Sequence, residues 1–324
     1  MVIVAFAGAS TGLGLTVLNT FLSIPNAHKL VLLSRSASPS LTARGVDVRP
    51  VDYTSHSSLT FALTGVHTIL SFIGSMDTSV VETAQLALIA AAKEAGVKRF
   101  APSEYAASSN EGIDAYAVKA RVWQALKRSG LEYTKFSCGL FMNILGTGTP
   151  KDVSEGSWAA TGEEEALGAL RPWDFVIDKR RGTADLPGNG DTKMALTSTE
   201  DIGRFVLKAL DLDAWPEELG MKGDLKTFNE LVELLEKAQE RKFLVRHNSV
   251  AEMQEQIQRD ESTRFYNQVR VVIAEGNFKV PDTLNKAFPD IKPTTAEEYI
   301  EKWWGGVTDL GEPAWGKGVV FDVA

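Results

Sequence analysis

Short apolar runs alternate with stretches of helical period along the first 140 residues. Residues 2–7 form a continuous apolar run that predicts a buried strand, and Leu15, Leu18 and Leu22 then recur with helical spacing. Further strands are expected at 29–34, 46–51, 66–73, 97–101 and 131–137, with helices at 57–63, 79–95 and 114–126. Helical stretches separate most of these strands and no tight hairpin signal lies between them. The pattern therefore predicts a parallel sheet with right-handed crossovers.

The second half of the chain is less regular. Residues 146–168 are rich in Gly, Thr, Ser and Glu with little periodicity, which predicts a long surface excursion or lid. Residues 194–197 suggest a strand that returns to the sheet, and capping boxes at Thr227 and Ser249 predict two later helices. The expected fold class is α/β, with a doubly wound parallel sheet over residues 1–150 and a return at 190–210. A smaller, partly interleaved α+β domain is expected over 151–324.

Composition and charge exclude several classes of protein. The 324 residues are 44% hydrophobic and carry a net charge of −8, so an electrostatic attraction to nucleic acid is not expected. No apolar run approaches the length of a membrane span, and the chain opens on a strand instead of a targeting signal, so a cytoplasmic location without membrane contact is expected. Cys138 is the single cysteine, which excludes an internal disulfide. The four histidines show no metal-ligand spacing, so no metal site is expected.

A glycine-rich turn joins the first strand to the first helix. The amino end of a helix offers unpaired N–H groups and a partial positive charge, and glycines let the backbone approach a pyrophosphate closely. The spacing is G-x-x-x-G-x-G, which departs from the usual G-x-G-x-x-G. A plain strand-to-helix turn without a ligand is the alternative. The residues expected to bind a dinucleotide here are Gly8, Ser10, Thr11, Gly12, Leu13 and Gly14.

The second strand ends at Ser34 and Arg35, with no Asp or Glu beside them. An acidic residue at this position favours the ribose of NAD, whereas a basic residue favours the 2′-phosphate of NADP. The planar fork of an arginine can donate two charged hydrogen bonds to a phosphate. The position therefore predicts NADPH, with a solvated loop arginine as the alternative. Asp52, which ends the third strand, is expected at the adenine edge.

Ligands of such sheets gather at the carboxyl ends of the strands. The further cofactor contacts expected there are Ser71, Phe72, Ile73, Gly74, Pro102, Ser103, Glu104, Lys119 and Cys138. Cys138 has no spacing partner that would make it a nucleophile. The substrate contacts expected are Tyr105, Phe141, Met142, Asn143 and Trp173. Core packing is the alternative for Phe141, Met142 and Trp173.

These stretches together resemble the NmrA-like and isoflavone-reductase-like branch of the atypical short-chain dehydrogenase/reductase family, which includes reductases of the phenylcoumaran benzylic ether type. The similar stretches are 8–14, Lys98-Arg99-Phe100-Ala101-Pro102-Ser103-Glu104-Tyr105, the helix that carries Lys119, 137–143, 188–193, 199–204, 228–231 and 301–304. The resemblance implies a Rossmann domain that carries NADPH and a smaller substrate domain. In reductase members the matching lysine lies near the nicotinamide, and by resemblance that role falls to Lys119.

Two features depart from the wider family. None of the six tyrosines has a lysine four residues later, so the Tyr-x-x-x-Lys pair is absent and a tyrosine-dependent carbonyl reduction is not expected. On a gapless match, Thr11 occupies the middle position of the branch's Gly-x-x-Gly-x-x-Gly turn. Phosphate binding remains expected, but from a shifted set of N–H groups.

The function expected is NADPH-dependent reduction of a small secondary-metabolite-type substrate, with an aromatic substrate and coupled ring formation left open. Lys119 either assists proton transfer or anchors the cofactor ribose. The alternative function is a non-catalytic NADP(H)-binding redox sensor or transcriptional regulator of the NmrA type. Lys119 and the aromatic-rich second half favour the enzyme. The sequence leaves the oligomeric state open, a homodimer included.

Overall fold

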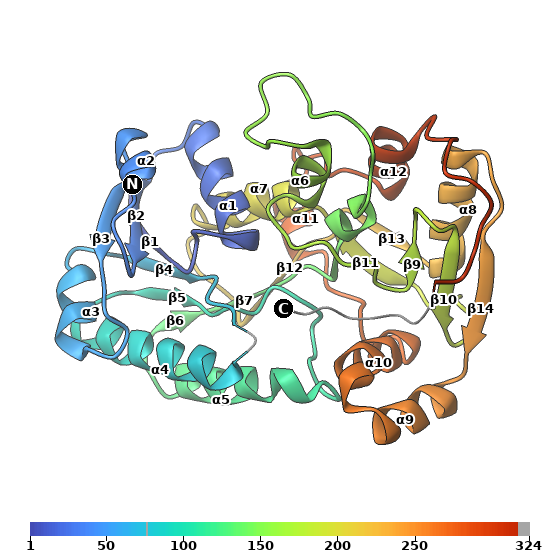
Figure 1. The fold of residues 1–324 in the computed structure, drawn as a ribbon. Coiled ribbons are helices and arrows are strands. Elements are labelled where there is room, and N and C mark those ends of the chain that lie inside the picture. The colour runs from blue at the N-terminus through green and yellow to red at the C-terminus, as the bar shows by residue number, and fades with distance from the viewer. Residues whose placement is uncertain (76, 317–324) are drawn as a thin grey trace.

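The computed structural model describes residues 1–75 and 77–316 and shows a main sheet of six parallel strands in the order β3-β2-β1-β4-β5-β6 (Figure 1). The strands are β1 (Ile3–Ala7), β2 (Lys29–Ser34), β3 (Asp47–Pro50), β4 (Thr68–Ser71), β5 (Arg99–Ala101) and β6 (Glu132–Tyr133). The strand order reverses between β1 and β4, as in a doubly wound Rossmann sheet. The predicted α/β fold class is therefore confirmed.

Helices cover both faces of this sheet. Those of the first half are α1 (Gly12–Ser23), α2 (Pro39–Ala43), α3 (His56–Ala62), α4 (Thr78–Glu94) and α5 (Ala117–Lys127). Alternate residues of β1 point to opposite sides, because side chains alternate along a strand. Ala5 and Ala7 pack with α3, α4 and α5, whereas Val4 and Phe6 pack with α1 and with α7 (Thr199–Ala209) (Figure 1). The short helix α2 was not predicted.

The helix expected at 114–126 begins later than its sequence suggests. Residues Asp114–Tyr116 form a 3-10 turn, η1, and α5 starts at Ala117. The Asp114 carboxylate makes no capping bond, because it accepts hydrogen bonds from Arg264 at 2.8 Å and Gln268 at 2.8 Å. These bonds join η1 to helix α10 (Glu261–Ala274) of the second half.

The strand expected at 131–137 is divided at Thr134. Up to that residue, β6 pairs with β5; beyond it, β7 (Lys135–Ser137) pairs with β12 (Glu218–Gly220). The Lys135 N–H donates to the carbonyl of Glu217 at 3.0 Å, so the hydrogen bonding of the strand transfers to a later part of the chain. The second half thereby extends the strand layer of the first.

The second half contains two further three-stranded sheets. One has the order β13-β11-β8 and the other β14-β10-β9. The strands are β8 (Leu140–Phe141), β9 (Ile177–Asp178), β10 (Thr183–Pro187), β11 (Met194–Thr197), β13 (Asp224–Lys226) and β14 (Leu244–Asn248). The strand expected at 194–197 therefore forms, but the prediction that it pairs with the main sheet is wrong. β11 pairs with β8, which follows directly on β7 through Gly139, and α7 is the element that packs back against α1.

The remaining helices surround these sheets. They are η2 (Met142–Gly146), α6 (Gly162–Leu167), α8 (Phe228–Gln239), α9 (Val250–Arg259), α10 (Glu261–Ala274), α11 (Thr283–Ala287) and α12 (Ala296–Trp304). Capping boxes begin α8 at Thr227 and α9 at Ser249, as predicted, and a third begins α12 at Thr295.

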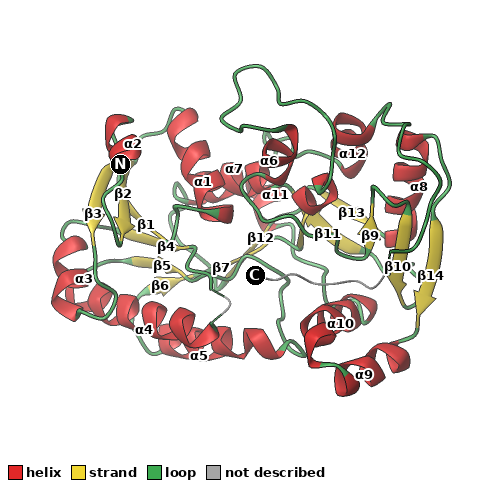
Figure 2. Cartoon of the chain, in the orientation of Figure 1, coloured by secondary structure: helices red, strands yellow, loops and turns green. Residues whose placement is uncertain are grey.

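The excursion predicted at 146–168 is a long loop that projects beyond the helices and ends in the short helix α6 (Figure 2). The Thr16 hydroxyl of α1 donates a hydrogen bond to the carbonyl of Gly168, so the end of the excursion is attached to the Rossmann half. No helix in the described ranges is both long and apolar enough to cross a bilayer.

Candidate functional site

The turn between β1 and α1 uses its glycines for different purposes. Gly8 has φ +76°, and a Cβ there would come 2.8 Å from the backbone nitrogen of Ile73. A Cβ at Gly14 would come 2.6 Å from the Cα of Ala9. Gly12, by contrast, has φ +56° and open space around it. Gly8 and Gly14 thus allow close packing, while Gly12 keeps the backbone bare at the start of α1.

The residues around Gly12 leave the amino end of α1 accessible. Ser10 and Thr11 are exposed, and the Thr11 side chain makes no capping hydrogen bond although Thr11 precedes the helix. Leu13 is partly buried and packs against the core under α1. The first N–H groups of the helix are therefore free of a side-chain cap, and such groups favour an anion.

The end of β2 presents Arg35 to solvent beside Tyr53. Burial raises the pKa of Tyr53 to about 12, against the opposing charge of Arg35. Ser34 is partly buried at the last position of the strand. Asp52 is exposed, and its carboxylate accepts hydrogen bonds from the Thr54 hydroxyl and N–H, which lower its pKa. Asp52 is thus bonded within its own turn, and a contact with adenine stays a prediction.

The end of β4 lies next to the glycine turn. The Ser71 hydroxyl is buried and has no hydrogen-bond partner among the described residues. Phe72 stacks on Tyr105 with ring centroids 4.9 Å apart, Ile73 contacts Gly8, and Gly74 is exposed. A buried hydroxyl without a partner is costly, and a ligand that bonds it would remove that cost.

The end of β5 carries an ion pair between a buried carboxylate and a partly buried lysine. Pro102 is buried, and the Ser103 N–H donates to the Gln85 side chain at 2.8 Å. The Glu104 carboxylate lies 3.8 Å from the Lys119 ammonium of α5. Burial raises the pKa of Glu104, and the charges of Lys119 and Lys135 and a hydrogen bond from Asn110 only partly offset the rise.

Tyr105 and Cys138 lie behind this pair. The Tyr105 ring is stacked between Phe72 and Phe136, at 4.9 and 5.8 Å, and only 7% of the residue is exposed. Cys138 is fully buried, and burial raises the pKa of its thiol to about 12 against the opposing charge of Lys119. Both side chains therefore pack in the core behind the site, and neither exposes enough surface to contact a ligand extensively.

Asn143 and Met142, expected as substrate contacts, are buried in η2. The Asn143 side chain accepts from the Thr199 N–H at 2.7 Å and donates to the Ala166 carbonyl at 2.9 Å. Met142 is fully buried in the core of the second half. These two side chains therefore stabilise η2. Phe141 is partly buried and packs on the core of the Rossmann half.

A row of partly buried aromatic rings starts at Lys119. The Lys119 Nζ lies 4.4 Å from the ring centroid of Tyr116, and Tyr116 meets Phe265 of α10 edge to face at 5.8 Å. Phe265 in turn lies 6.3 Å from Trp173, whose ring also contacts Phe175 at 4.5 Å. Trp173 thus joins the site through Phe265. Phe265 could not be predicted from the sequence, because its partners lie far away along the chain and α10 has no distinct sequence signal.

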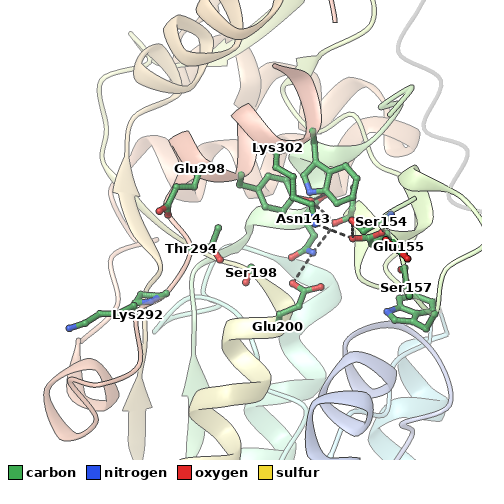
Figure 3. A pocket seen from close by; sticks show the side chains of 17 residues that line it. Asn143, Ser154, Glu155, Ser157, Ser198, Glu200, Lys292, Thr294, Glu298 and Lys302 are labelled. Atoms are coloured by element: carbon green, nitrogen blue, oxygen red, sulfur yellow. Dashed lines mark hydrogen bonds and ion pairs between the residues drawn. The ribbon is translucent and has the colours of Figure 1, made fainter. Parts of the chain in front are cut away.

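A separate cavity of about 690 Å³ lies between the excursion, α6, α7 and α12 (Figure 3). Asn143 is the one predicted site residue that lines it. Lys302 also lines this cavity and pairs with Glu165 at 3.0 Å. Burial would raise the pKa of Glu165, but the hydrogen bonds from Ser154 and Lys302 lower it to about 2. The cavity therefore does not contain the glycine turn, Arg35 or Lys119.

The strand order and the glycine turn define a protein of the Rossmann class. Residues 2–300 match the model of the NmrA-like family, and the chain therefore belongs to the NmrA-like family. The resemblance found in the sequence is confirmed. Within residues 1–75 and 77–316, no group of three or more His, Cys, Asp or Glu side chains could hold a metal ion.

Relatives of this chain include named reductases. The chain is 30% identical over 248 residues to Oxidoreductase BOA1 of Botryotinia fuckeliana, covering 72% of this chain and 75% of that protein. It is 29% identical over 283 residues to Phenylcoumaran benzylic ether reductase TP7 of Nicotiana tabacum, covering 79% and 81%. A solved structure of AtPrR2 with NADP+ and (+)pinoresinol has the same fold, with a TM-score of 0.73, 20% identity, and 93% and 98% of the two chains covered.

Proposed function

We propose that this protein is an NADPH-dependent reductase of a small aromatic metabolite. The observation that carries the proposal is the convergence of three features at one edge of the sheet. These are the bare glycine turn at Gly12, the basic end of β2 at Arg35, and the ion pair of Lys119 with the buried Glu104. The relatives named as reductases, and the solved neighbour that holds NADP+, support the same function.

The residues at this edge fit a dinucleotide phosphate. The N–H groups at the start of α1 suit the pyrophosphate, because Gly12 has no Cβ and Thr11 does not cap the helix. Arg35 suits the 2′-phosphate, and the unpartnered hydroxyl of Ser71 suits a polar group bound nearby. When bound, NADPH supplies the hydride of the reaction.

Lys119 is the proposed proton donor. Its side chain is 16% exposed, its charge is balanced by Glu104, and its ammonium faces the Tyr116 ring. An ammonium placed in this way can give a proton to a substrate oxygen, nitrogen or carbon as the neighbouring carbon is reduced. Anchoring of the cofactor ribose is the other role that Lys119 could have, and the experiment below separates the two.

The aromatic row Tyr116–Phe265–Trp173 is the proposed binding surface for the substrate ring. It comes from both halves of the chain and begins beside Lys119. Aromatic rings pair favourably in edge-to-face and offset-stacked arrangements, and they exclude water from a reacting centre. The row therefore supports an aromatic substrate over a small aliphatic one.

The test uses NADPH deuterated at the transferable position of the nicotinamide. The protein is mixed with it and with small metabolites extracted from the source organism, and deuterated products are sought by mass spectrometry. Lys119→Ala runs in parallel, with Lys127→Ala as a matched control, because Lys127 is an exposed lysine on the same helix. Label that appears with wild type and Lys127→Ala, and not with Lys119→Ala, supports the reductase and the role of Lys119.

Other outcomes contradict parts of the proposal. If Lys119→Ala binds NADPH as tightly as wild type and transfers label at full rate, Lys119 is not the proton donor. If Lys119→Ala loses NADPH affinity in proportion to its rate, the lysine is a cofactor anchor. Tight NADPH binding by wild type with no labelled product from any fraction favours the non-catalytic NADP(H)-binding protein.

A further inference from the structure

The Glu104 carboxylate is held in one place at the end of β5. The Asn110 side chain donates to its Oε2 at 2.9 Å, and the Glu104 N–H donates to the Pro102 carbonyl at 2.7 Å in a tight turn. The same Oε2 lies 3.8 Å from the Nζ of Lys119. The Glu104 side chain is 8% exposed, so this carboxylate faces Lys119 in a largely dry environment.

Lys119 is held by a charge and a ring instead of hydrogen bonds. In the described part of the chain, no acceptor lies within hydrogen-bond distance of its Nζ. The Glu104 carboxylate lies 3.8 Å from this ammonium, the centroid of the Tyr116 ring is 4.4 Å away, and the buried Cys138 thiol is near enough to be affected by its charge. The N–H groups of Lys119 are therefore available to a bound molecule, while its charge is balanced by a single buried carboxylate.

The other charged group that faces Glu104 is Lys135 of β7. Its Nζ donates to the Ser108 carbonyl and lies 3.8 Å from the Oε2 of Glu218. Lys135 therefore has a carboxylate of its own. Lys119 depends on Glu104, and the two ion pairs have the same separation of 3.8 Å.

We propose that Glu104 is the positioning residue for Lys119: its fixed carboxylate is the counter-charge that directs the ammonium toward the aromatic row. This inference rests on the proposed function, in which Lys119 gives a proton to the substrate. After that transfer Lys119 is a neutral amine, and one proton from solvent restores the ammonium. Each turnover then adds one hydride from NADPH and one proton from water to the substrate, and Glu104 is unchanged.

The test measures the protonation of Lys119 without any substrate. Wild type and variants are treated with trace acetic anhydride across a range of pH, and acylation at Lys119 is read by mass spectrometry relative to the exposed Lys98. Only the neutral amine reacts. Glu104→Gln keeps the shape of the side chain and removes its charge, so acylation of Lys119 at a fixed, near-neutral pH is expected to rise about tenfold.

Three further variants make the result specific. Glu218→Gln removes a carboxylate at the same distance from a different lysine, and it is expected to leave Lys119 acylation unchanged. Glu104→Asp retains the charge and is expected to stay within about threefold of wild type. Glu104→Ala provides a second uncharged variant in case Glu104→Gln does not fold, which thermal unfolding would reveal.

Acylation of Lys119 that follows the same pH profile in wild type and in the folded uncharged variants overturns the proposal. An equal shift in Glu218→Gln overturns it too, because the effect would then be the general field of the protein. The measurement needs neither NADPH nor substrate. Failure of the deuterium-transfer experiment would therefore be distinguishable from failure here.

Discussion

Gly14 of α1 lies directly against Ala9 of the preceding turn, so that a Cβ at Gly14 would come 2.6 Å from the Ala9 Cα. The carbonyl of Gly8 and the Cβ of Phe72 would each be 2.9 Å away. Two residues earlier, Gly12 has nothing within 4 Å of its Cβ position. Two glycines of one turn therefore have separable roles, the first in packing the helix on the sheet and the second in leaving the backbone open.

We expect Gly14→Ala to destabilise the fold by about 1–3 kcal/mol, because backbone atoms block the new methyl group. Gly12→Ala should lower the free energy of unfolding by about 1 kcal/mol, because Gly12 has a left-handed φ of +56°. It should nevertheless weaken NADPH binding at least as much as Gly14→Ala does. Thermal unfolding and calorimetric NADPH titration measure the two effects. NADPH binding by Gly12→Ala at wild-type affinity would show that this turn does not hold the phosphates.

Arg35→Ala tests the choice of cofactor. The loss of charged hydrogen bonds to a 2′-phosphate should weaken NADPH binding by roughly 10- to 100-fold and leave NADH binding unchanged. Arg128→Ala is the control, since Arg128 is an exposed arginine at the far end of α5. Equal losses for NADPH and NADH in Arg35→Ala would remove Arg35 as the discriminating residue.

Phe265→Ala tests the aromatic row. With the substrate identified by deuterium transfer, KM should rise by about two- to tenfold while NADPH affinity stays the same, because one ring contact is lost. Phe61→Ala is a matched control: Phe61 lies on α3, is 83% exposed and belongs to a different part of the surface. A KM unaffected by Phe265→Ala would contradict this placement of the substrate ring.

The pH dependence of stability should differ between two buried carboxylates. Burial raises the pKa of Glu104 above 4.5, so its charged form opposes folding at neutral pH, and the cost fades as the pH falls through the raised pKa. Glu104→Gln should therefore unfold at a higher temperature than wild type at pH 8, and the difference should disappear near pH 4.

Asp185 should behave in the opposite way. Burial alone would raise the pKa of Asp185, but the hydrogen bonds of Arg246 and Asn248 and the charge of Arg270 lower it below 3.8. The charge of Asp185 therefore stabilises the fold at pH values above 3.8, and this contribution is lost as the pH falls through the lowered pKa. Asp185→Asn should lose about 3–5 kcal/mol at pH 8, because it leaves the buried Arg270 without its counter-ion. Thermal unfolding of wild type and both variants across pH 2–8 checks the two signs, because the Asp185 contribution is lost only below pH 3.8.

The main sheet could be predicted because each strand is a local apolar run with a helix or turn after it. β1, β2 and β4 are buried on both faces, which leaves an uninterrupted apolar signature in the sequence. The division of the sixth strand at Thr134 could not be predicted. It depends on a backbone bond from Lys135 to Glu217, and nothing near Thr134 in the sequence marks that partner.

The candidate site was predictable at the strand ends and less so in the second half. Gly12, Arg35 and Glu104 follow the carboxyl ends of β1, β2 and β5, and Lys119 of α5 lies beside Glu104; their contact with a cofactor stays a prediction. Asn143 looked equally suitable, since it also follows a strand. Its partners Ala166 and Thr199, 23 and 56 residues further on, bury it to 1% exposure. Side-chain direction after a strand is set by such distant contacts.

The packing of α7 on α1 has a consequence for the order in which the chain folds during synthesis. Val17, Leu18 and Phe21 of α1 share one core with Ile202 and Phe205 of α7, and a Cβ at Gly203 would come 2.6 Å from the Thr20 hydroxyl. A ribosome that has released only the first six strands has therefore produced a sheet on which one face is covered by α1 without its partner α7. That face is closed only after about 70 more residues have emerged. The amino-terminal half is thus the first to start folding, but its core is complete only after α7 of the carboxyl-terminal half has been synthesised.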